Sequence, residues 1–197
     1  MKLIVLQLPF NFPIPVLALG SQTKNSLCLV KGSQAYLSRV HADLNNPHDY
    51  SSFEKDLKFF LRRKPGIIAC DLHPDYQSSR MAGVLQDQGY RLAVILHHHA
   101  HIAALMAENR LAKNQKVIGV SFDGTGLGPE NQIWGGEFLI CGYRRFVRAA
   151  FLKEVVLLGA EKAVQEPWRL AAYWLEEIYG DKFLDLGIDF TRKINKR

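Results

Sequence analysis

The chain contains the stretch VIGVSFDGTG at residues 117–126, which decides how the surrounding sequence is expected to fold. Its first six residues form the mostly apolar run of a buried strand. Asp123 follows this run, and Gly124, Thr125 and Gly126 come next. A hydroxyl residue between glycines lets backbone N–H groups approach phosphate oxygens. The stretch therefore predicts a strand leading into a phosphate-binding hairpin; a plain glycine-rich turn capped by the aspartate is the alternative.

A cluster of histidines, HHHAH at residues 97–101, precedes this stretch and directly follows an apolar run at 92–96. On a helix, His97 and His101 lie one turn apart on the same face. The carboxyl edge of an α/β sheet is where ligands usually bind. Two imidazoles fill half of a typical coordination shell, so a carboxylate should join them, and Asp123 is the natural candidate. The alternative is an imidazole-rich helix start whose rings cap the helix or face solvent.

Composition limits the classes of partner. The chain has 197 residues, 48% hydrophobic and 22% charged, and a net charge of +6. Part of that charge lies in the last six residues, and no basic run is interleaved with aromatics as a nucleic-acid surface requires. Cys28, Cys70 and Cys141 are far apart with no C-x-x-C, which predicts reduced, buried thiols in a cytoplasmic protein.

The sequence predicts no membrane contact. The apolar start at residues 1–19 is interrupted by Pro9, Pro13 and Pro15 and has no clear cleavage site, so it is unlike a signal peptide. Elsewhere no run reaches the roughly 18 apolar residues that a membrane helix needs. We therefore expect a soluble, intracellular protein.

The order of elements predicts an α/β fold that begins twice. Polar turns and apolar runs predict an antiparallel meander of three short strands, and the S-x-x-E sequence at Ser51 predicts the start of a helix as a capping box. The expected elements are strands at 16–19, 26–30, 34–38, 67–70 and 92–96 with helices from 51 and over 77–88 and 98–111, then strands at 116–122, 133–143 and 146–158 and a helix over 165–179.

Two lobes follow from that order. Residues 1–113 form a complete first lobe, and residues 114–197 begin a second that lacks a strand-helix-strand-helix segment. That segment would need about 50 to 60 further residues at typical element lengths. An unpaired sheet edge in such a lobe favours association, so a homodimer is one expectation.

The strand and hairpin at 117–126 resemble those of the actin-like ATPase and sugar-kinase superfamily, whose members contain two ribonuclease-H-like lobes. A narrower resemblance rests on HHHAHIAALMAENRL, VIGVSFDGTGLG, IWGGEFLICGY and EPWRLA, together with IIACDLHPDY and residues 16–38. In order and spacing, residues 10–180 resemble the C-terminal transferase domain of the hydrogenase-maturation carbamoyltransferase family, HypF. The tRNA threonylcarbamoyl transferases are related but lack the HHHAH and IWGGEF motifs.

The resemblance implies a specific chemistry. The family makes carbamoyl-adenylate from carbamoyl phosphate and ATP, and passes the carbamoyl group to a C-terminal cysteine of a HypE-like maturation protein. It implies a divalent metal, zinc or iron, beside the nucleotide phosphate, and leaves the catalytic residue unassigned. The implied metal ligands are His97, His101 and Asp123; the implied nucleotide- and phosphate-binding residues are Gly124, Thr125, Gly126, Gly135, Gly136 and Lys24, although an exposed turn lysine is an equal alternative for the last.

The sequence departs from the family in three ways. The acylphosphatase-like, zinc-finger and adenylate-forming parts are absent, and so are the later adenosine-binding stretch and metal-binding aspartate. Residues 157–160 read Leu-Leu-Gly-Ala where the family has Leu-Pro-Gly-Gly. We therefore expect little or no turnover by this chain alone, with another chain supplying the missing C-terminal half. A catalytically incomplete metal-binding, nucleotide-binding or docking fragment is the alternative, and an unrelated kinase-like ATPase is disfavoured by the histidines.

Four further residues attract attention. Trp134 and Trp168 have apolar neighbours and are expected to be packing anchors. His73 follows a strand end, where it either approaches the site or stabilises a turn. Glu137 alternates with apolar residues, so it points either to solvent or into the cleft.

Overall fold

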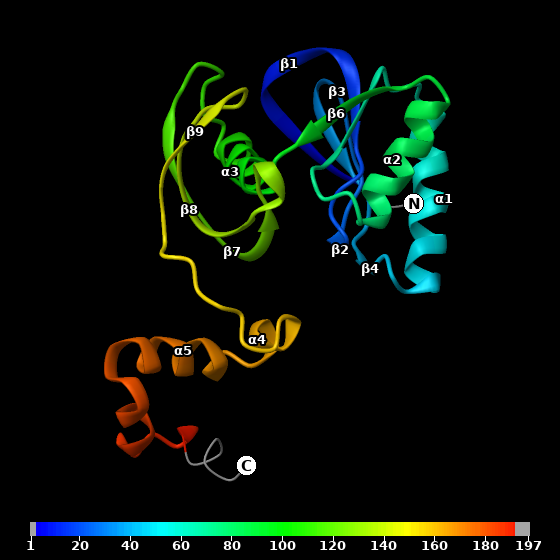
Figure 1. Ribbon diagram of the computed structural model, residues 1–197. Coiled ribbons are helices and arrows are strands. Elements are labelled where there is room, and N and C mark those ends of the chain that lie inside the picture. The colour runs from blue at the N-terminus through cyan, green and yellow to red at the C-terminus, as the bar shows by residue number, and fades with distance from the viewer. Residues whose placement is uncertain (1–2, 192–197) are drawn as a thin grey trace. The chain divides into compact units, whose positions relative to one another are not determined.

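The computed structural model describes residues 3–191, except for the side chains of Thr125 and Glu161. It divides into two compact units, Met1–Phe151 and Leu152–Arg197. The first unit is an α/β arrangement of strands and helices, and the second is helical (Figure 1). The lobe boundary predicted after residue 113 falls within the first unit, between a helix and a strand, and stays a prediction.

The first sheet has the strand order β3-β1-β5-β6. Strand β1 (Ile4–Ala18) pairs antiparallel with β3 (Cys28–Leu37) and parallel with β5 (Ile67–Asp71), which in turn pairs parallel with β6 (Arg91–Ile95). Both α1 (Pro47–Leu61) and α2 (Gln77–Asp87) pack beside it (Figure 1). Two short strands, β2 (Thr23–Asn25) and β4 (His41–Asp43), form a separate pair.

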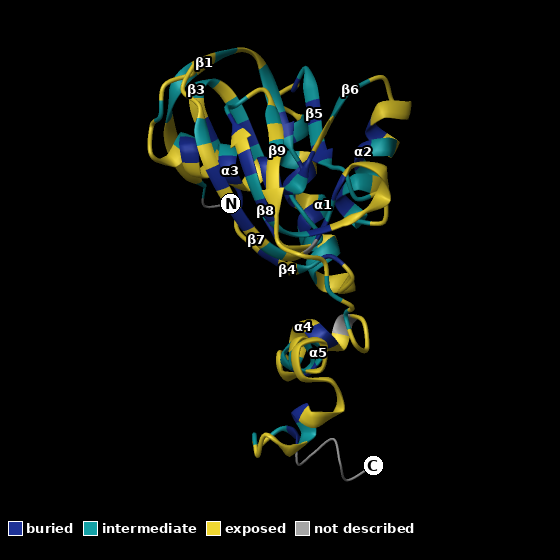
Figure 2. Cartoon of the chain, turned by 60° about the vertical axis from the view of Figure 1, so that its left-hand side comes forward, coloured by how far each residue is buried: buried dark blue, intermediate teal, exposed yellow. Residues whose placement is uncertain are grey.

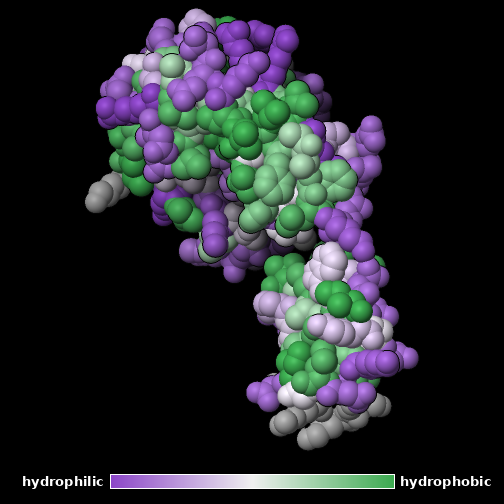
Figure 3. All heavy atoms as spheres, turned by 90° about the vertical axis from the view of Figure 1, so that its left-hand side faces the viewer, coloured by the Kyte–Doolittle hydropathy of each residue, from purple (hydrophilic) through white to green (hydrophobic). Residues whose placement is uncertain are grey.

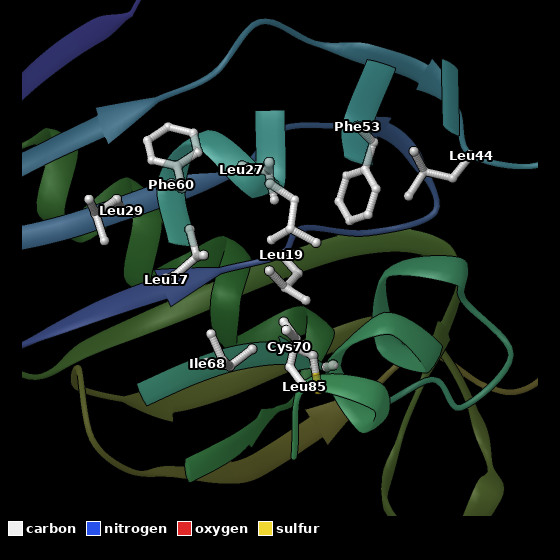
Figure 4. Close-up of a cluster of buried hydrophobic side chains, with 12 residues drawn as sticks. Leu17, Leu19, Leu27, Leu29, Leu44, Phe53, Phe60, Ile68, Cys70 and Leu85 are labelled. Carbon is white, nitrogen blue, oxygen red and sulfur yellow. The ribbon is translucent and has the colours of Figure 1, made fainter. Parts of the chain in front are cut away.

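The core of this sheet is aliphatic and aromatic. The predicted apolar stripe of α1 is buried at Phe53, Leu57 and Phe60. These side chains form one cluster with Leu17 and Leu19 of the central strand region and with neighbours from β3, β5 and α2 (Figure 4). Burying such side chains contributes roughly 1.5 to 3 kcal/mol each, so this cluster holds the central strands in place.

The predicted meander is wrong. The two expected strands at 26–30 and 34–38 form a single strand, because residues 4–7 of β1 extend far enough to pair with residues 34–37. Gly32, in the expected turn, has a φ of +63° and bends the strand instead of ending it. Pro9, Pro13 and Pro15 of β1 lie in the two stretches where the pairing of β1 with β3 is irregular. The loss of a ladder hydrogen bond is tolerated there.

The predicted capping box at Ser51 is also wrong. Helix α1 begins at Pro47, and the side chain of Asn46 accepts a hydrogen bond from the backbone N–H of His48 at 2.9 Å. Asparagine at the N-cap followed by proline in the first turn is a strong helix start, so Ser51 lies inside the helix.

The second sheet consists of β7 (Val117–Leu127), β8 (Ile133–Cys141) and β9 (Phe146–Phe151), all antiparallel. Helix α3 (His97–Glu108) packs against β7 and β8, and a Cβ at Gly119 would lie 2.3 Å from the side chain of Ile102. Exposed residues alternate with buried or half-buried ones along β7. Figure 2 shows how burial varies over the strands and helices. The sheet exposes the side chains of Ile118, Val120 and Phe122. Apolar side chains gather on the face of the molecule that Figure 3 draws.

Two details of this sheet differ from the prediction. The expected glycine turn at 124–126 lies inside β7, at a register shift between Phe122 and Gly126, and the chain reverses at residues 128–132 around a short 3-10 helix, η1 (Pro129–Asn131). Strand β9 ends at Phe151 rather than at 158. The DGTG stretch is therefore an irregular strand segment and not the tip of the hairpin.

The second unit contains α4 (Glu161–Gln165), α5 (Trp168–Tyr179) and the 3-10 helix η2 (Gly180–Asp185). The helix predicted over 165–179 is confirmed as α5, but it begins at Trp168, because Glu166, which precedes Pro167, has a non-helical φ of −122°. Trp168 is 37% exposed, with its ring centroid 6.3 Å from that of Phe190. Within residues 3–191, no helix has the length and apolar character needed to cross a membrane.

Ala160 occupies a strained backbone conformation at the start of α4. Its φ is +51° and its ψ is −119°, a combination that glycine adopts far more readily than alanine. This is the position where the family resemblance in the sequence calls for the second glycine of Leu-Pro-Gly-Gly. The backbone at this position therefore has a conformation typical of glycine, although the residue is alanine.

Candidate functional site

Three elements meet at the candidate site. Parallel strands β5 and β6 end at the same edge, where Asp71 pairs with Ile95. Helix α3 begins two residues later with His97. Strand β7 passes the start of this helix and presents Asp123 from its irregular segment. The carboxyl edge predicted for ligand binding therefore holds residues from both sheets.

The structure brings the three predicted metal ligands together. Nε2 of His97 lies 2.9 Å from Oδ2 of Asp123 and 3.0 Å from Nε2 of His101. One ligand atom from each of the three residues lies within 4.8 Å of the others. Tetrahedral zinc with bonds of about 2.1 Å would separate its ligand atoms by roughly 3.4 Å. The donor set and its spacing therefore fit a divalent ion, and metal binding stays a prediction.

Asp71 is a member of the site that the sequence analysis missed. Its Oδ2 lies 2.6 Å from Nδ1 of His97, on the opposite side of the ring from Asp123. A carboxylate behind a histidine commonly orients metal-binding imidazoles. The sequence indicates that Asp71 ends a strand, but only the structure shows that this strand neighbours the one leading to His97.

The two carboxylates make the site favourable for positive charge. Hydrogen bonds to Asp123 and then Asp71 raise the pKa of His97 from 6.5 to about 9, against the lowering effect of burial. The same hydrogen bond from His97 lowers the pKa of Asp123 below its ordinary value. In the metal-free chain, the positive charge of protonated His97 therefore balances the carboxylates that a bound cation would otherwise neutralise.

This protonation predicts a pH dependence for metal-free stability. The pKa of His97 in the folded chain, about 9, exceeds its ordinary value of 6.5, so its stabilising contribution is complete below pH 6.5 and is lost as pH rises through 9. We expect the free energy of unfolding, measured by urea denaturation with a chelator present, to fall over this window by roughly 3 kcal/mol. The His97→Ala variant should lack that fall; an equal slope in the variant would contradict the assignment.

Two of the four clustered histidines are core residues. His98 is fully buried and lies against the hairpin, since a Cβ at Gly126 would come within 2.2 Å of its ring. Burial lowers the pKa of His98. His99 is 8% exposed and its Nε2 lies 2.7 Å from the carbonyl oxygen of Gly142, to which it donates. The alternative interpretation, rings that cap the helix or face solvent, is therefore wrong for these two histidines, because both are buried and no side chain in the described part of the chain caps the start of α3.

The predicted phosphate-binding residues are only partly assembled. A Cβ at Gly135 would lie 3.5 Å from the carbonyl oxygen of Asp123, and Gly136 pairs with Phe122 in the ladder. Both glycines therefore lie opposite the irregular segment with Gly124 and Gly126, while the Thr125 side chain is outside the described part. Lys24 lies on β2 with an exposed side chain and a φ of +48°, and within residues 3–191 it makes no hydrogen bond or ion pair with the histidine cluster.

The structure decides the residues left open by the sequence. Glu137 is 1% exposed and accepts two hydrogen bonds from Arg148, at 2.6 and 2.9 Å. Trp134 is a buried packing residue, 5% exposed. Nδ1 of His73 accepts a hydrogen bond from the backbone N–H of Asp75 at 3.2 Å, which is the turn-stabilising role.

Two family models match the chain in sequence order. Residues 13–108 match the HypF Kae1-like domain, and residues 119–196 match the second subdomain of the carbamoyltransferase Kae1-like domain. Curated relatives are the carbamoyltransferases HypF of Rhodobacter capsulatus, 37% identical over 86% of this chain, and of Synechocystis sp., 36% identical over 96%. The chain spans about a quarter of the length of each, 25% and 26%.

Solved structures agree with this assignment. A crystal structure of full-length HypF in the phosphate- and nucleotide-bound form matches with a TM-score of 0.79 at 32% identity, covering 96% of this chain and 30% of that one. HypF of T. kodakarensis matches with a TM-score of 0.78 at 29% identity, covering 89% of this chain and 23% of that one. With its mixed α/β fold and its histidine-bearing sheet edge, the chain belongs to the HypF family of carbamoyltransferases, over the region of their Kae1-like domain.

Proposed function

We propose that this chain provides the metal- and phosphate-binding part of a carbamoyl transfer, from carbamoyl-adenylate to a cysteine of a HypE-like maturation protein. The observation that carries the proposal is the convergence of His97, His101 and Asp123 within 4.8 Å. It is supported by the relatives, which are named carbamoyltransferase HypF, and by the similar structure described as phosphate- and nucleotide-bound.

The residues suit the proposed reaction. A bound zinc or iron ion would polarise the carbonyl of the acyl-phosphate anhydride. His97 and His101 offer ring nitrogens to it, and Asp123 offers a carboxylate at the start of the glycine segment. Backbone N–H groups of residues 124–126 would hold the nucleotide phosphate. In the transfer, the thiol loses its proton to solvent, its sulfur bonds to the carbamoyl carbon, the bond from that carbon to the phosphate oxygen breaks, and AMP leaves.

Other predicted residues would act around this centre. Gly135 and Gly136 would leave room for the substrate beside the hairpin, and Lys24 would add positive charge near the phosphate. We also propose that β7, β8, β9 and the helices after them begin a second lobe of the same topology as the first, with a boundary between residues 113 and 114. The separate family matches at 13–108 and 119–196 support this. The three free cysteines suit a cytoplasmic location.

A chimera tests the function. Residues 13–196 of this chain replace the matching region of the Rhodobacter capsulatus relative, and transfer of labelled carbamoyl groups to the acceptor protein is measured. We expect transfer by the chimera and none by the same chimera with His97→Ala/His101→Ala. The isolated chain should give little or no turnover, because it spans a quarter of its relatives. A folded chimera that transfers nothing, or a double variant that transfers normally, would refute the proposed function.

A further inference from the structure

Asp71 is fixed from both of its carboxylate oxygens. Its side chain is 8% exposed, and Oδ1 accepts a hydrogen bond from the backbone N–H of His73 at 2.9 Å. Oδ2 faces Nδ1 of His97 at 2.6 Å. The Ser79 hydroxyl donates to the carbonyl oxygen of Asp71 at 3.2 Å, which ties this strand end to α2. The carboxylate is therefore a rigid acceptor rather than a freely rotating group.

This contact fixes one proton of His97 on Nδ1. An ionised carboxylate only accepts hydrogen bonds, so Nδ1 of His97 must donate. A neutral ring with its proton on Nδ1 keeps its lone pair on Nε2. Nε2 is the atom directed at Asp123 and His101. When a binding cation displaces the Nε2 proton, the orientation of the ring and the proton that stays on Nδ1 together present a lone pair to the centre of the cluster.

His101 lacks a comparable support. Its side chain is exposed, and the hydrogen-bond partner of its Nε2 in the described structure is the ring of His97. The two predicted ligands therefore differ: His97 is held by strand β5, while His101 depends on its neighbour. Any preorganisation of the cluster for a cation has to come through His97.

We propose that Asp71 is a positioning residue: it holds His97 with its proton on Nδ1, so that Nε2 is ready to bind a divalent cation without Asp71 touching that cation. This inference rests on the proposed metal site. Loss of such outer-shell carboxylates typically weakens metal affinity about 10- to 100-fold. Asp71→Asn keeps the size of the side chain but removes the charge and lets an amide N–H compete for Nδ1.

Two readouts independent of catalysis test the proposal. Zinc affinity is measured by competition with a chelator for the wild type, Asp71→Asn and the control Asp75→Asn. The control changes a carboxylate of the same loop that is 73% exposed and bonded to Arg80. Proton NMR of the metal-free protein, with selective histidine labelling, detects the downfield Nδ1 proton of His97 that a carboxylate acceptor produces.

We expect the wild type to show that downfield proton, and Asp71→Asn to lose it and to bind zinc about 10- to 100-fold more weakly. Asp75→Asn should match the wild type in both measurements. A wild type with no proton on Nδ1 overturns the proposal without relying on any variant. Equal zinc affinity of wild type and Asp71→Asn overturns the role of Asp71 alone, whereas a wild type that binds no zinc overturns the proposed metal site as well.

Discussion

Zinc binding by the double variant His97→Ala/His101→Ala is expected to fall at least about a thousandfold, below detection in an ordinary titration. The variant removes two of the three ligand atoms that lie within 4.8 Å of one another. Loss of an outer-shell partner alone costs roughly 10- to 100-fold, and each direct ligand should cost more. The wild type should bind about one equivalent of zinc or iron, measured by mass spectrometry of untagged protein after removal of excess metal.

Matched variants show whether that loss is local. His48→Ala removes an imidazole from α1 that is 92% exposed, so it should bind metal as the wild type does. His99→Ala removes a third clustered histidine, whose ring hydrogen-bonds to the carbonyl oxygen of Gly142 instead of facing the site. This variant should have a lower free energy of unfolding but should bind as much metal as the wild type. A wild type without metal after incubation with excess ion, or a double variant that retains it, would exclude this site.

Arg148→Ala is expected to lower the free energy of unfolding by about 3 to 5 kcal/mol, because it leaves the buried carboxylate of Glu137 without its partner. The side chain of Glu137 is 1% exposed, and the guanidinium of Arg148 is 2.6 Å from it. The same guanidinium lies over the rings of Trp134 and Phe151, at 4.3 and 3.9 Å from their centroids. Removal therefore also loses packing between β8 and β9.

Urea denaturation measures this effect. Arg80→Ala is the control, since its ion pair with Asp75 is exposed on both sides, 59% and 73%, and should contribute about 1 kcal/mol or less. The double variant Glu137→Gln/Arg148→Met removes both charges and should recover much of the loss. If Arg148→Ala and Arg80→Ala have equal free energies of unfolding, the loss of its ion-pair partner does not destabilise the buried carboxylate of Glu137, and the prediction is wrong.

Local spacing explains which parts of the site the sequence could indicate. The pair His97 and His101 follows from helical periodicity alone, and Asp123 follows from its place at the end of an apolar run. That these side chains meet depends on α3 packing against β7, which Ile102 and Gly119 permit by close contact. Asp71 cannot be assigned to the site from the sequence, because its role depends on which strands are neighbours, and sequence patterns do not give strand order.

Other details of the fold were also beyond prediction from local sequence, because they depend on contacts between distant residues or on competing local signals. A turn at Gly32 is locally reasonable, and only the pairing of residues 4–7 with 34–37 converts it into a bend within one strand. Two capping signals compete for the start of α1, and the helix begins at Pro47, capped by Asn46, rather than at Ser51. The burial of Glu137 could not be chosen from alternation, because its partner Arg148 lies on the next strand.

Helix α3 presents His97 and His101 to the site and His98, Ile102 and Met106 to the core. Inserting or deleting one residue within it would turn everything beyond that point by about 100°, exchanging coordinating and packing positions. Substitutions could be absorbed one at a time, but a change of length could not. In an alignment of related chains, we therefore expect no insertions or deletions between residues 97 and 106. We expect them instead in the loop at 109–116, where a change of length does not rotate any residue of α3.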